Sequence, residues 1–550
     1  MKKANYLLLL ILPLVLVVTS VFLNRARGPY WLGGNLDPEY VYLLNAANLA
    51  GLKGVGHIDH PGTPVQVLGA VTIRVLYFFN FSATVDMQTD VMQRPEYYLN
   101  AINRVLIALE AIMLFLLGLA TFRFSGSLWP ALWLQSAPFF SITVLQFGLT
   151  RVTPEPFLFF SSLAMVTLLI VFLHKSNETE KLTRPNTPSG GSVENPPPRT
   201  RLLNFLSTQP LIFFLFALVT GFGIANKITF LPTAIIPLVI IPKIKNKIYY
   251  LVGVGIGFVV FTLPIIRMYP RFFGWIVDLL THSGRYGSGP SQLLSTESYL
   301  QNLKTLLSGN LLFSASLILA FVAIAFSVFI PKWRRTAGST FYFKLLVAIA
   351  AAQLFGLLMV SKHSSHHYLM PVLNLAGLAL LLVFLLLKHI LEPGKKGRKI
   401  LIIAAPVLFI LAFVLVNPIN RFNKTISQLT SLKEKSLALY AEVETGYADY
   451  AKVYYYRSSS PAYALKFGND LSRSYHSQTL QKIYKDTWFY DIWTRRYTTF
   501  DYNETVPFET LRARYNDKIL FQGSRGLKIP GLQLKDVAKI RFYEGIFVIE

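Results

Sequence analysis

A short acidic string, NLDPEY, follows the first apolar run of the chain and carries two carboxylates, Asp37 and Glu39. Carboxylates at a membrane surface are costly to desolvate, so they are often kept there for chemistry or for a metal ion. The pair could take up a proton as a general base or bind a divalent cation through oxygen. The alternative is local, because Asp37 at an N-cap, followed by Pro38, would also start a helix over PEYVYLLNAANLA, with Glu39 favoured by the helix dipole.

Charged side chains recur beside other apolar blocks. Glu155 and Arg151 lie in RVTPEPF, which reads as a rigid proline-flanked turn. Arg151 could pair with Glu155 or with a phosphate, and Glu155 could equally be a plain turn residue. Lys227 lies inside an apolar stretch, where a lysine either serves a function or extends its ammonium group to the membrane surface. The residues alone leave these alternatives open.

Two histidine-rich segments are further candidates. The first, GVGHIDHPGTP, contains His57, Asp59 and His60. Metal ligation is conceivable there, but no standard zinc spacing is present, so substrate contact or a hydrogen-bonded loop is favoured. The second, KHSSHHYL, contains Lys362, His363, His366, His367 and Tyr368. Its three histidines share one face if the segment is helical, and the pattern is not the H-E-x-x-H of zinc peptidases.

The elements that would position these residues are membrane helices. Hydrophobic residues make up 53% of the 550 residues, charged residues only 15%, and the apolar residues form blocks long enough to span a bilayer. We expect about eleven spans, near residues 6–23, 101–121, 128–148, 156–173, 209–225, 229–242, 249–266, 309–330, 341–360, 369–387 and 400–416. The first is expected to be a retained anchor, since no A-x-A cleavage site precedes Asn24. The absence of cysteine excludes disulfides and thiol chemistry.

The net charge of +25 lies largely in short loops, and its asymmetry predicts an orientation. With the N-terminus in the cytoplasm, most dense basic clusters fall on the cytoplasmic side, together with the linker 174–208, which we expect to be disordered. Four segments are then left outside: 24–100, 151–155, 267–308 and 362–368. A basic balance of this kind also fits an anionic lipid substrate, whereas no nucleic-acid-binding motif is present.

An odd number of spans places residues 417–550 outside the cytoplasm as well. There, SQLTSLKEKSLALYAEVETGYADY and SPAYALKFG predict helices, AKVYYY and KILFQG predict strands, and AKIRFYEGIFVIE predicts a closing hairpin. We therefore expect a polytopic α-helical membrane protein with a small C-terminal extracytoplasmic α/β domain.

Several motifs, taken in order, resemble those of a known family. LDPEY, HPGTPV, RVTPEPF, GFGIANKITFLP and HHYLMPVLN are similar to motifs of the C-fold (GT-C) integral-membrane glycosyltransferases, in particular the protein O-mannosyltransferase and aminoarabinose-transferase branch. The resemblance covers roughly residues 1–390. It implies transfer of a sugar from a polyprenyl-phosphate carrier to a protein, lipid or glycan acceptor outside the membrane. It also implies a catalytic membrane domain over 1–416, an extracytoplasmic domain over 417–550 and residence in the bacterial inner membrane.

The resemblance further implies roles for individual residues. Asp37 matches the catalytic Asp and would be the general base of an inverting displacement. Glu155, and Glu39 in a modified Asp-x-Asp, would hold the acceptor or a divalent cation, with no other cofactor implied. Lys227 matches a phosphate-binding lysine. Further contacts with donor phosphate or sugar are expected from Arg104, Arg151, His57, Asp59, His60, Arg267, Arg285, Tyr286, Lys362, His363, His366, His367 and Tyr368. The Gly-rich HSGRYGSGPS in the 267–308 loop is expected to act as a lid.

Two other functions stay open at this point. A transporter or flippase of lipid-linked sugars would place polar residues and broken helices at mid-membrane in matching halves. The polar residues of this chain gather at one face instead, which favours surface chemistry. A non-catalytic membrane scaffold, with its function in residues 417–550, would tolerate the loss of the Asp37 carboxylate.

Overall fold

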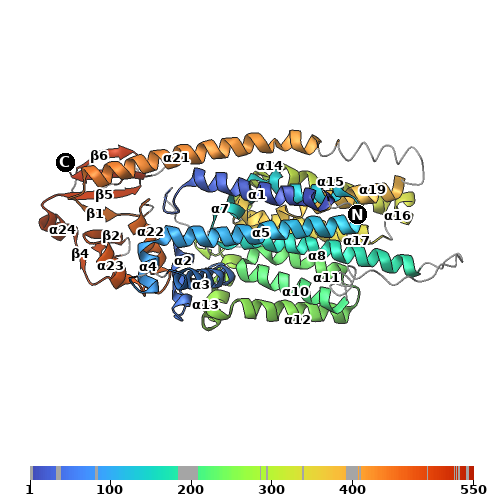
Figure 1. Cartoon of the computed structure of the whole chain (residues 1–550), viewed down its shortest axis with the longest axis horizontal. Helices are drawn as coiled ribbons and strands as arrows, with labels where there is room; N and C mark the ends of the chain where they lie inside the picture. The colour runs from blue at the N-terminus through green and yellow to red at the C-terminus, as the bar shows by residue number, and fades with distance from the viewer. Residues whose placement is uncertain are drawn as a thin grey trace.

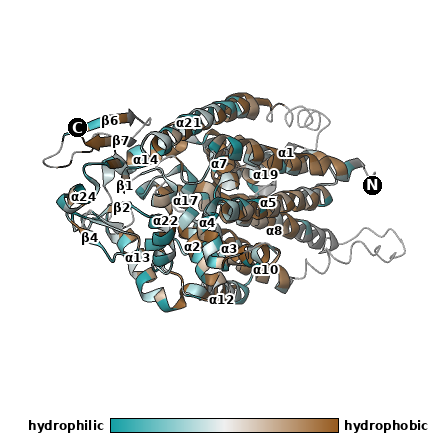
Figure 2. Cartoon of the chain, turned by 60° about the vertical axis from the view of Figure 1, so that its left-hand side comes forward, coloured by the Kyte–Doolittle hydropathy of each residue, from teal (hydrophilic) through white to brown (hydrophobic). Residues whose placement is uncertain are grey.

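The computed structural model describes residues 4–32, 39–80, 84–183, 209–284, 287–292, 295–336, 340–391, 407, 410–456, 458–491, 494–524, 527, 529, 533–539 and 544–549. They form a bundle of long helices with a sheet at one end (Figure 1). Hydrophobic residues are concentrated on the bundle helices, and hydrophilic residues on the end that carries the sheet (Figure 2). This is the division between membrane and aqueous parts that the composition predicts.

Seven helices in the described part of the chain are long and apolar enough to cross a membrane. They are α1 (Ala4–Arg27), α5 (Pro95–Ser125), α8 (Pro154–Thr183), α12 (Ile244–Phe261), α15 (Leu311–Phe329), α17 (Phe341–Lys362) and the run His366–Ile390, which comprises η6 (His366–Leu369), α18 (Met370–Leu373) and most of α19 (Ala376–Leu391). The polytopic helical fold is therefore confirmed, whereas the number of eleven spans stays a prediction.

Three of the expected spans are bent or short. The span near 128–148 is broken into α6 (Leu128–Ser136), η1 (Ala137–Phe140) and α7 (Ile142–Thr150), with a bend of 81°. The other two are α10 (Gln209–Asn226) and the pair η3 (Ile228–Ala234) and α11 (Ile235–Ile240). Pro232 lies inside η3, where it removes a backbone donor and favours a tighter, irregular turn. Of the span expected at 400–416, the structure describes 407 and 410–416, of which 410–416 is helical.

Short helices cover the sheet end of the bundle. They are α2 (Glu39–Ala50), α3 (Thr63–Phe78), α4 (Met87–Gln93) and α13 (Tyr269–Thr281) (Figure 1). Every residue of α2 except Leu49 is buried. An amphipathic surface helix would expose one face, so α2 is enclosed between the bundle and the C-terminal segment.

Two segments expected between membrane spans contain helices. The segment 267–308 is mostly helical, because η4 (Leu263–Met268), α13 and α14 (Thr296–Gly309) occupy it. The first residues of the linker expected at 174–208 are helical, since α8 continues past His174 to Thr183. Residues 184–208 lie outside the described part. The short helix α16 (Pro331–Thr336) lies between α15 and α17 in the chain, in a segment expected on the cytoplasmic side.

The C-terminal segment forms a seven-stranded mixed sheet in the order β4-β3-β2-β1-β5-β7-β6. The strands are β1 (Ala451–Tyr454), β2 (Thr487–Asp491), β3 (Arg496–Thr498), β4 (Thr505–Val506), β5 (Ile519–Ser524), β6 (Leu534–Lys539) and β7 (Glu544–Ile549). The central strands β2, β1 and β5 are parallel, and the other pairs are antiparallel. The helices are α21 (Pro418–Gly446), α22 (Pro461–Asp470), α23 (Ser477–Ile483) and α24 (Phe508–Tyr515). The strands at 451 and 519 and the closing hairpin are thus confirmed.

The C-terminal segment docks on α2. Asn45 Nδ2 donates to the Leu471 carbonyl at 3.3 Å, and Asn48 Nδ2 donates to the Ser472 carbonyl at 2.7 Å. His476 Nε2 lies 2.8 Å from Asn48 Oδ1. A hydrophobic cluster crosses the same joint, and α21 runs beside α1 toward the sheet (Figure 1). Helix α22 and the residues that follow it therefore hold in place the helix that begins with Glu39.

Candidate functional site

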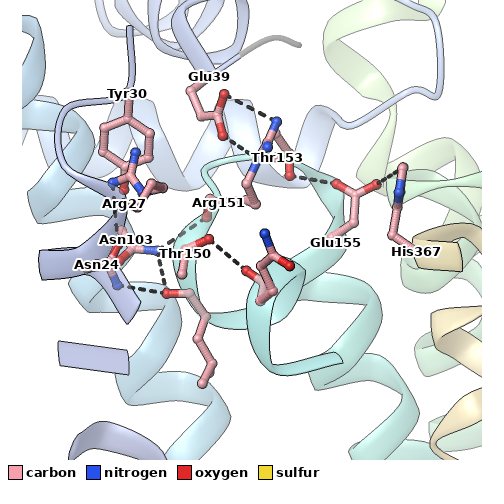
Figure 3. Close-up of polar contacts among 12 residues, drawn as sticks. Asn24, Arg27, Tyr30, Glu39, Asn103, Thr150, Arg151, Thr153, Glu155 and His367 are labelled. Atoms are coloured by element: carbon pink, nitrogen blue, oxygen red, sulfur yellow. Dashed lines mark hydrogen bonds and ion pairs between the residues drawn. The ribbon is translucent and has the colours of Figure 1, made fainter. Parts of the chain in front are cut away.

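The candidate site is assembled from helix ends. Glu39 is the first residue of α2, Arg151 caps the C-terminus of α7, and Glu155 lies in the first turn of α8. Lys227 separates α10 from η3, and His367 lies in η6. Figure 3 shows Glu39, Arg151, Glu155 and His367 gathered together. Side chains from the start of α2 and from three helix junctions, α7–α8, α10–η3 and α17–α18, thus meet at the end of the bundle that carries α2.

The first ion pair joins Glu39 and Arg151. Arg151 Nε contacts Glu39 Oε1, and the Glu39 side chain is 1% exposed. The turn that carries Arg151 is fixed by two asparagines on membrane helices: Asn24 Nδ2 donates to the Leu149 carbonyl at 3.0 Å, and Asn103 Nδ2 donates to the Leu149 and Arg151 carbonyls at 3.2 and 3.3 Å (Figure 3). Helices α1 and α5 therefore position the guanidinium group.

The second ion pair joins Glu155 and Lys227. Lys227 Nζ lies 2.6 Å from Glu155 Oε1, and the two side chains are 5% and 6% exposed. Thr153 Oγ1 donates to the other carboxylate oxygen at 2.5 Å, and His367 Nε2 lies 3.8 Å from Oε1. Lys227 Nζ also lies 4.3 Å from the centre of the Tyr368 ring. A buried charge needs such partners, because desolvation alone would make either ion unfavourable.

Aromatic rings enclose this second pair. His367 stacks on Phe147 with ring centres 4.4 Å apart and meets the Tyr368 ring edge-on at 4.4 Å. His60 lies 5.8 Å from the Tyr368 ring centre and 5.1 Å from that of Trp275. Burial and the nearby Lys227 charge lower the pKa of His60 well below its usual value, so its ring is neutral at neutral pH. The site therefore joins a charged part to an aromatic, neutral part.

The described charges of the site balance. Two carboxylates face two cations, and each cation is paired with one carboxylate. A phosphate that enters the site must therefore share Lys227 with Glu155, or Arg151 with Glu39. Charge-assisted hydrogen bonds of a phosphate with Lys and Arg are among the strong ones, so such an exchange is chemically reasonable.

The structure brings together seven of the residues expected from the sequence: Glu39, Arg151, Glu155, Lys227, His367, Tyr368 and His60. Asp37, Arg285 and Tyr286 lie outside the described residues. Within the described ranges, no group of three or more His, Cys, Asp or Glu side chains could hold a metal ion. The metal roles of Glu39 and Glu155 stay predictions.

Four other candidates lie apart from these ion pairs. Arg104 on α5 and Arg267 in η4 are exposed. His57 packs edge-on against the Tyr42 ring at 5.4 Å, and Asp59 is half-buried. Their expected contacts with substrate stay predictions.

Three basic candidates contact neighbouring backbone or amide groups. Lys362 Nζ donates to the Leu280 carbonyl at 2.5 Å, and His363 Nε2 lies 3.2 Å from the Leu279 carbonyl, both near the C-terminus of α13. Cations there are favoured by the helix dipole. His366 Nδ1 lies 3.1 Å from Asn310 Nδ2. These three side chains hold α13 and α14 against the bundle, whichever further role they have.

Some residues of the site were missed by the sequence reasoning. Thr153, Phe147 and Trp275 gave no signal of their own, because a threonine in a turn and aromatic residues in apolar helices are common. Asn24 and Asn103 could have been noticed, since an amide inside an apolar helix usually marks a contact between helices. Their partners are backbone carbonyls, which no side-chain pattern reveals.

Comparisons with known proteins give one match. No family model matches the chain, and no curated protein matches it. Among solved structures, the chain is similar to the crystal structure of ArnT from Cupriavidus metallidurans bound to undecaprenyl phosphate. The TM-score is 0.46 and the sequence identity 12%, over 99% of this chain and 98% of that chain. A likeness at this level assigns no role to any residue.

Proposed function

We propose that the protein is a membrane glycosyltransferase that moves a sugar from a polyprenyl-phosphate donor to an acceptor outside the cytoplasm. The observation that carries the proposal is the pair of buried ion pairs, Glu39–Arg151 and Glu155–Lys227, at one end of a membrane bundle. Asp37 precedes Glu39 by two residues, so the proposed base belongs to the segment that leads into this site. The sequence motifs that resemble the GT-C glycosyltransferases supply the same residues.

The reaction requires one proton acceptor and one site for a leaving phosphate. The hydroxyl oxygen of the acceptor attacks the anomeric carbon from the face opposite the phosphate. At the same time the Asp37 carboxylate takes the proton of that hydroxyl. The new glycosidic bond forms, the bond between the anomeric carbon and the phosphate oxygen breaks, and the configuration inverts. The bonding electrons leave with the carrier phosphate.

The basic side chains would stabilise that leaving group. Negative charge grows on the phosphate in the transition state, and preformed cations in a buried site stabilise it more strongly than water would. Lys227 and Arg151 are held by their carboxylates before the donor arrives, so they need little reorganisation. A divalent cation could bind Glu39 only if Arg151 moved away, so we assign the charge at the phosphate to the basic side chains.

The location of the site favours an enzyme over a transporter. The charged residues lie at helix ends beside α2 rather than at half-height on matching helices. A transporter needs a site reachable in turn from both sides, whereas glycosyl transfer needs access from one side only.

A genetic experiment tests the proposal. Deletion of the gene should remove one glycan modification from the cell envelope, and the wild-type chain should restore it. The Asp37→Asn variant, produced at the same level, should not restore it. An unchanged glycan profile in the deletion strain, or full restoration by the variant, would argue against the proposal.

A further inference from the structure

Four neutral polar side chains, two within two residues of Lys227 and two in the first turn of α3, have buried atoms without a hydrogen-bond partner. They are Thr63 Oγ1, both polar atoms of the Gln66 amide, Asn226 Oδ1 and Thr229 Oγ1. Thr63, Gln66 and Asn226 are 0% exposed, and Thr229 is 8% exposed. We call these four residues the amide–hydroxyl cluster. Native proteins pair nearly all buried polar groups, so a set of this size needs an explanation.

A backbone contact brings the start of α3, which carries Thr63 and Gln66, to the segment that carries Asn226 and Thr229. Gly62 N donates to the Asn226 carbonyl at 3.2 Å, which joins the start of α3 to the end of α10. Thr63 and Gln66 are three residues apart and lie on one face of α3. Asn226 and Thr229 flank Lys227 in the chain. The amide–hydroxyl cluster therefore belongs to the two segments that meet at Asn226, the residue before Lys227 of the Lys227–Glu155 ion pair.

Gly62 makes this approach possible. Its φ is 57°, and a Cβ at this position would lie 2.5 Å from a carbon of the Tyr42 ring. A larger residue would be strained and would clash, so glycine allows α3 to begin against Tyr42 of α2 while its backbone N–H reaches the Asn226 carbonyl. No side chain caps the start of α3, and Pro64 follows directly.

The chemistry of the cluster fits a neutral, hydroxyl-rich ligand. Amide and hydroxyl groups both donate and accept hydrogen bonds, as sugar hydroxyls do. A second phosphate would call for more cations, but the cation next to the cluster, Lys227, already pairs with Glu155. An apolar ligand would leave every one of these atoms unpaired. Trp275 Nε1, near His60, is also without a partner and adds a donor on the neutral side of the site.

We propose that the amide–hydroxyl cluster binds the sugar ring of the donor, while Lys227 faces its phosphate. The inference rests on the proposed function and deepens it, because it separates the residues that recognise the sugar from those that recognise the carrier. Sugar identity is then read by Thr63, Gln66, Asn226 and Thr229, and the carrier phosphate by basic side chains.

Binding measurements on the full-length protein in lipid nanodiscs test this separation. One probe is undecaprenyl phosphate. The other is a sugar-bearing lipid, chosen from a panel of undecaprenyl-phosphoryl hexoses and pentoses as the one that the wild-type protein turns over fastest. Gln66→Leu and Thr63→Val remove hydrogen-bonding atoms with little change of volume. Gln353→Leu is the matched control, since Gln353 is also fully buried with an unpartnered Oε1, but lies on α17 against Ser316.

We expect Gln66→Leu and Thr63→Val each to weaken binding of the sugar-bearing lipid about 5-fold, because each variant loses about one ordinary hydrogen bond to the sugar. Binding of undecaprenyl phosphate should stay unchanged. Gln353→Leu should alter neither. Thermal midpoints should not fall, because an apolar replacement of an unpaired buried group is neutral or stabilising. If Gln66→Leu fails to fold, Thr63→Val decides.

Two results would overturn the inference in different ways. Wild-type affinity of both variants for the sugar-bearing lipid, with turnover intact, would show that the cluster is structural or holds only water, and the proposed function would survive. A wild-type protein that binds no member of the panel more tightly than undecaprenyl phosphate and turns none over would contradict the proposed function, and the inference with it.

Discussion

Replacement of Lys227 by Met should have two separable effects. The change removes the cation 2.6 Å from Glu155 Oε1 and leaves a carboxylate that is 6% exposed without its main partner. Breaking a buried ion pair in this way costs about 3–5 kcal/mol of folding stability. Thr153 Oγ1 still donates to the carboxylate, so we expect the lower end of that range.

The second effect of Lys227→Met is on the affinity for the carrier, undecaprenyl phosphate, and it should exceed any loss of affinity caused by lower stability alone. A hydrogen bond to a charged group contributes about 1.5–3 kcal/mol, so affinity for undecaprenyl phosphate should fall about 10- to 150-fold. Glu155→Gln should act in the opposite direction. It removes the carboxylate that competes for Lys227, so it should strengthen binding of the carrier phosphate.

The assay is a titration of both variants with undecaprenyl phosphate in nanodiscs, with unfolding in SDS measured in parallel. Lys466→Met is the control, because Lys466 is a 5% exposed lysine paired with Asp470 at 2.7 Å in the C-terminal segment. It should cost stability without altering carrier affinity. Wild-type affinity in Lys227→Met, or weakened binding in Glu155→Gln, would refute the assignment of Lys227 to phosphate.

Three further predictions concern Asp37, His476 and the orientation of the chain. Asp37→Asn should fold and bind donor, since Asn caps a helix about as well as Asp, but its turnover should fall roughly 10²–10⁴-fold. Near-native turnover would end the assignment of Asp37 as the base. Glu39→Gln should reduce turnover less. Burial lowers the pKa of His476 to about 4, so the unfolded chain takes up this proton first as the pH falls, and stability should drop between about pH 6.5 and 4 by about 1.4 kcal/mol per pH unit. Thermal midpoints at pH 7.5 and 5 should show this loss in wild type and a smaller one in His476→Gln. Tags placed after residue 550 should be accessible on intact cells and tags within 184–208 should not, as the charge asymmetry of the loops predicts; the reverse would invert the orientation.

Much of the fold could be predicted because membrane helices depend on length and hydropathy, which are local properties. The strands near 451 and 519 could also be predicted, because β-branched and aromatic residues are concentrated in AKVYYY and KILFQG. The pairing of Glu39 with Arg151 could not, since it joins residues 112 positions apart. Neither could the docking of α2, because Asn45 and Asn48 bind backbone carbonyls of residues 471 and 472, which carry no side-chain signal.

The loops were harder to predict than the spans. The Gly-rich HSGRYGSGPS was expected to act as a lid in the 267–308 loop, and the residues before and after it form α13 and α14, which the sequence reasoning did not predict. Lys362 and His363 were expected to contact substrate, and that role stays a prediction, because sequence shows charge but not the direction of a side chain. In the structure they reach carbonyls at the end of α13.

The central claim is tested most directly by following the donor itself. Purified protein in nanodiscs is supplied with polyprenyl-phosphoryl sugars and an envelope extract as acceptor, and the release of free polyprenyl phosphate is measured by mass spectrometry. We predict release by wild type with one of these sugars and little release by Asp37→Asn at equal protein. No release by wild type with any sugar, or equal release by the two proteins, would contradict a glycosyltransferase that uses Asp37 as its base.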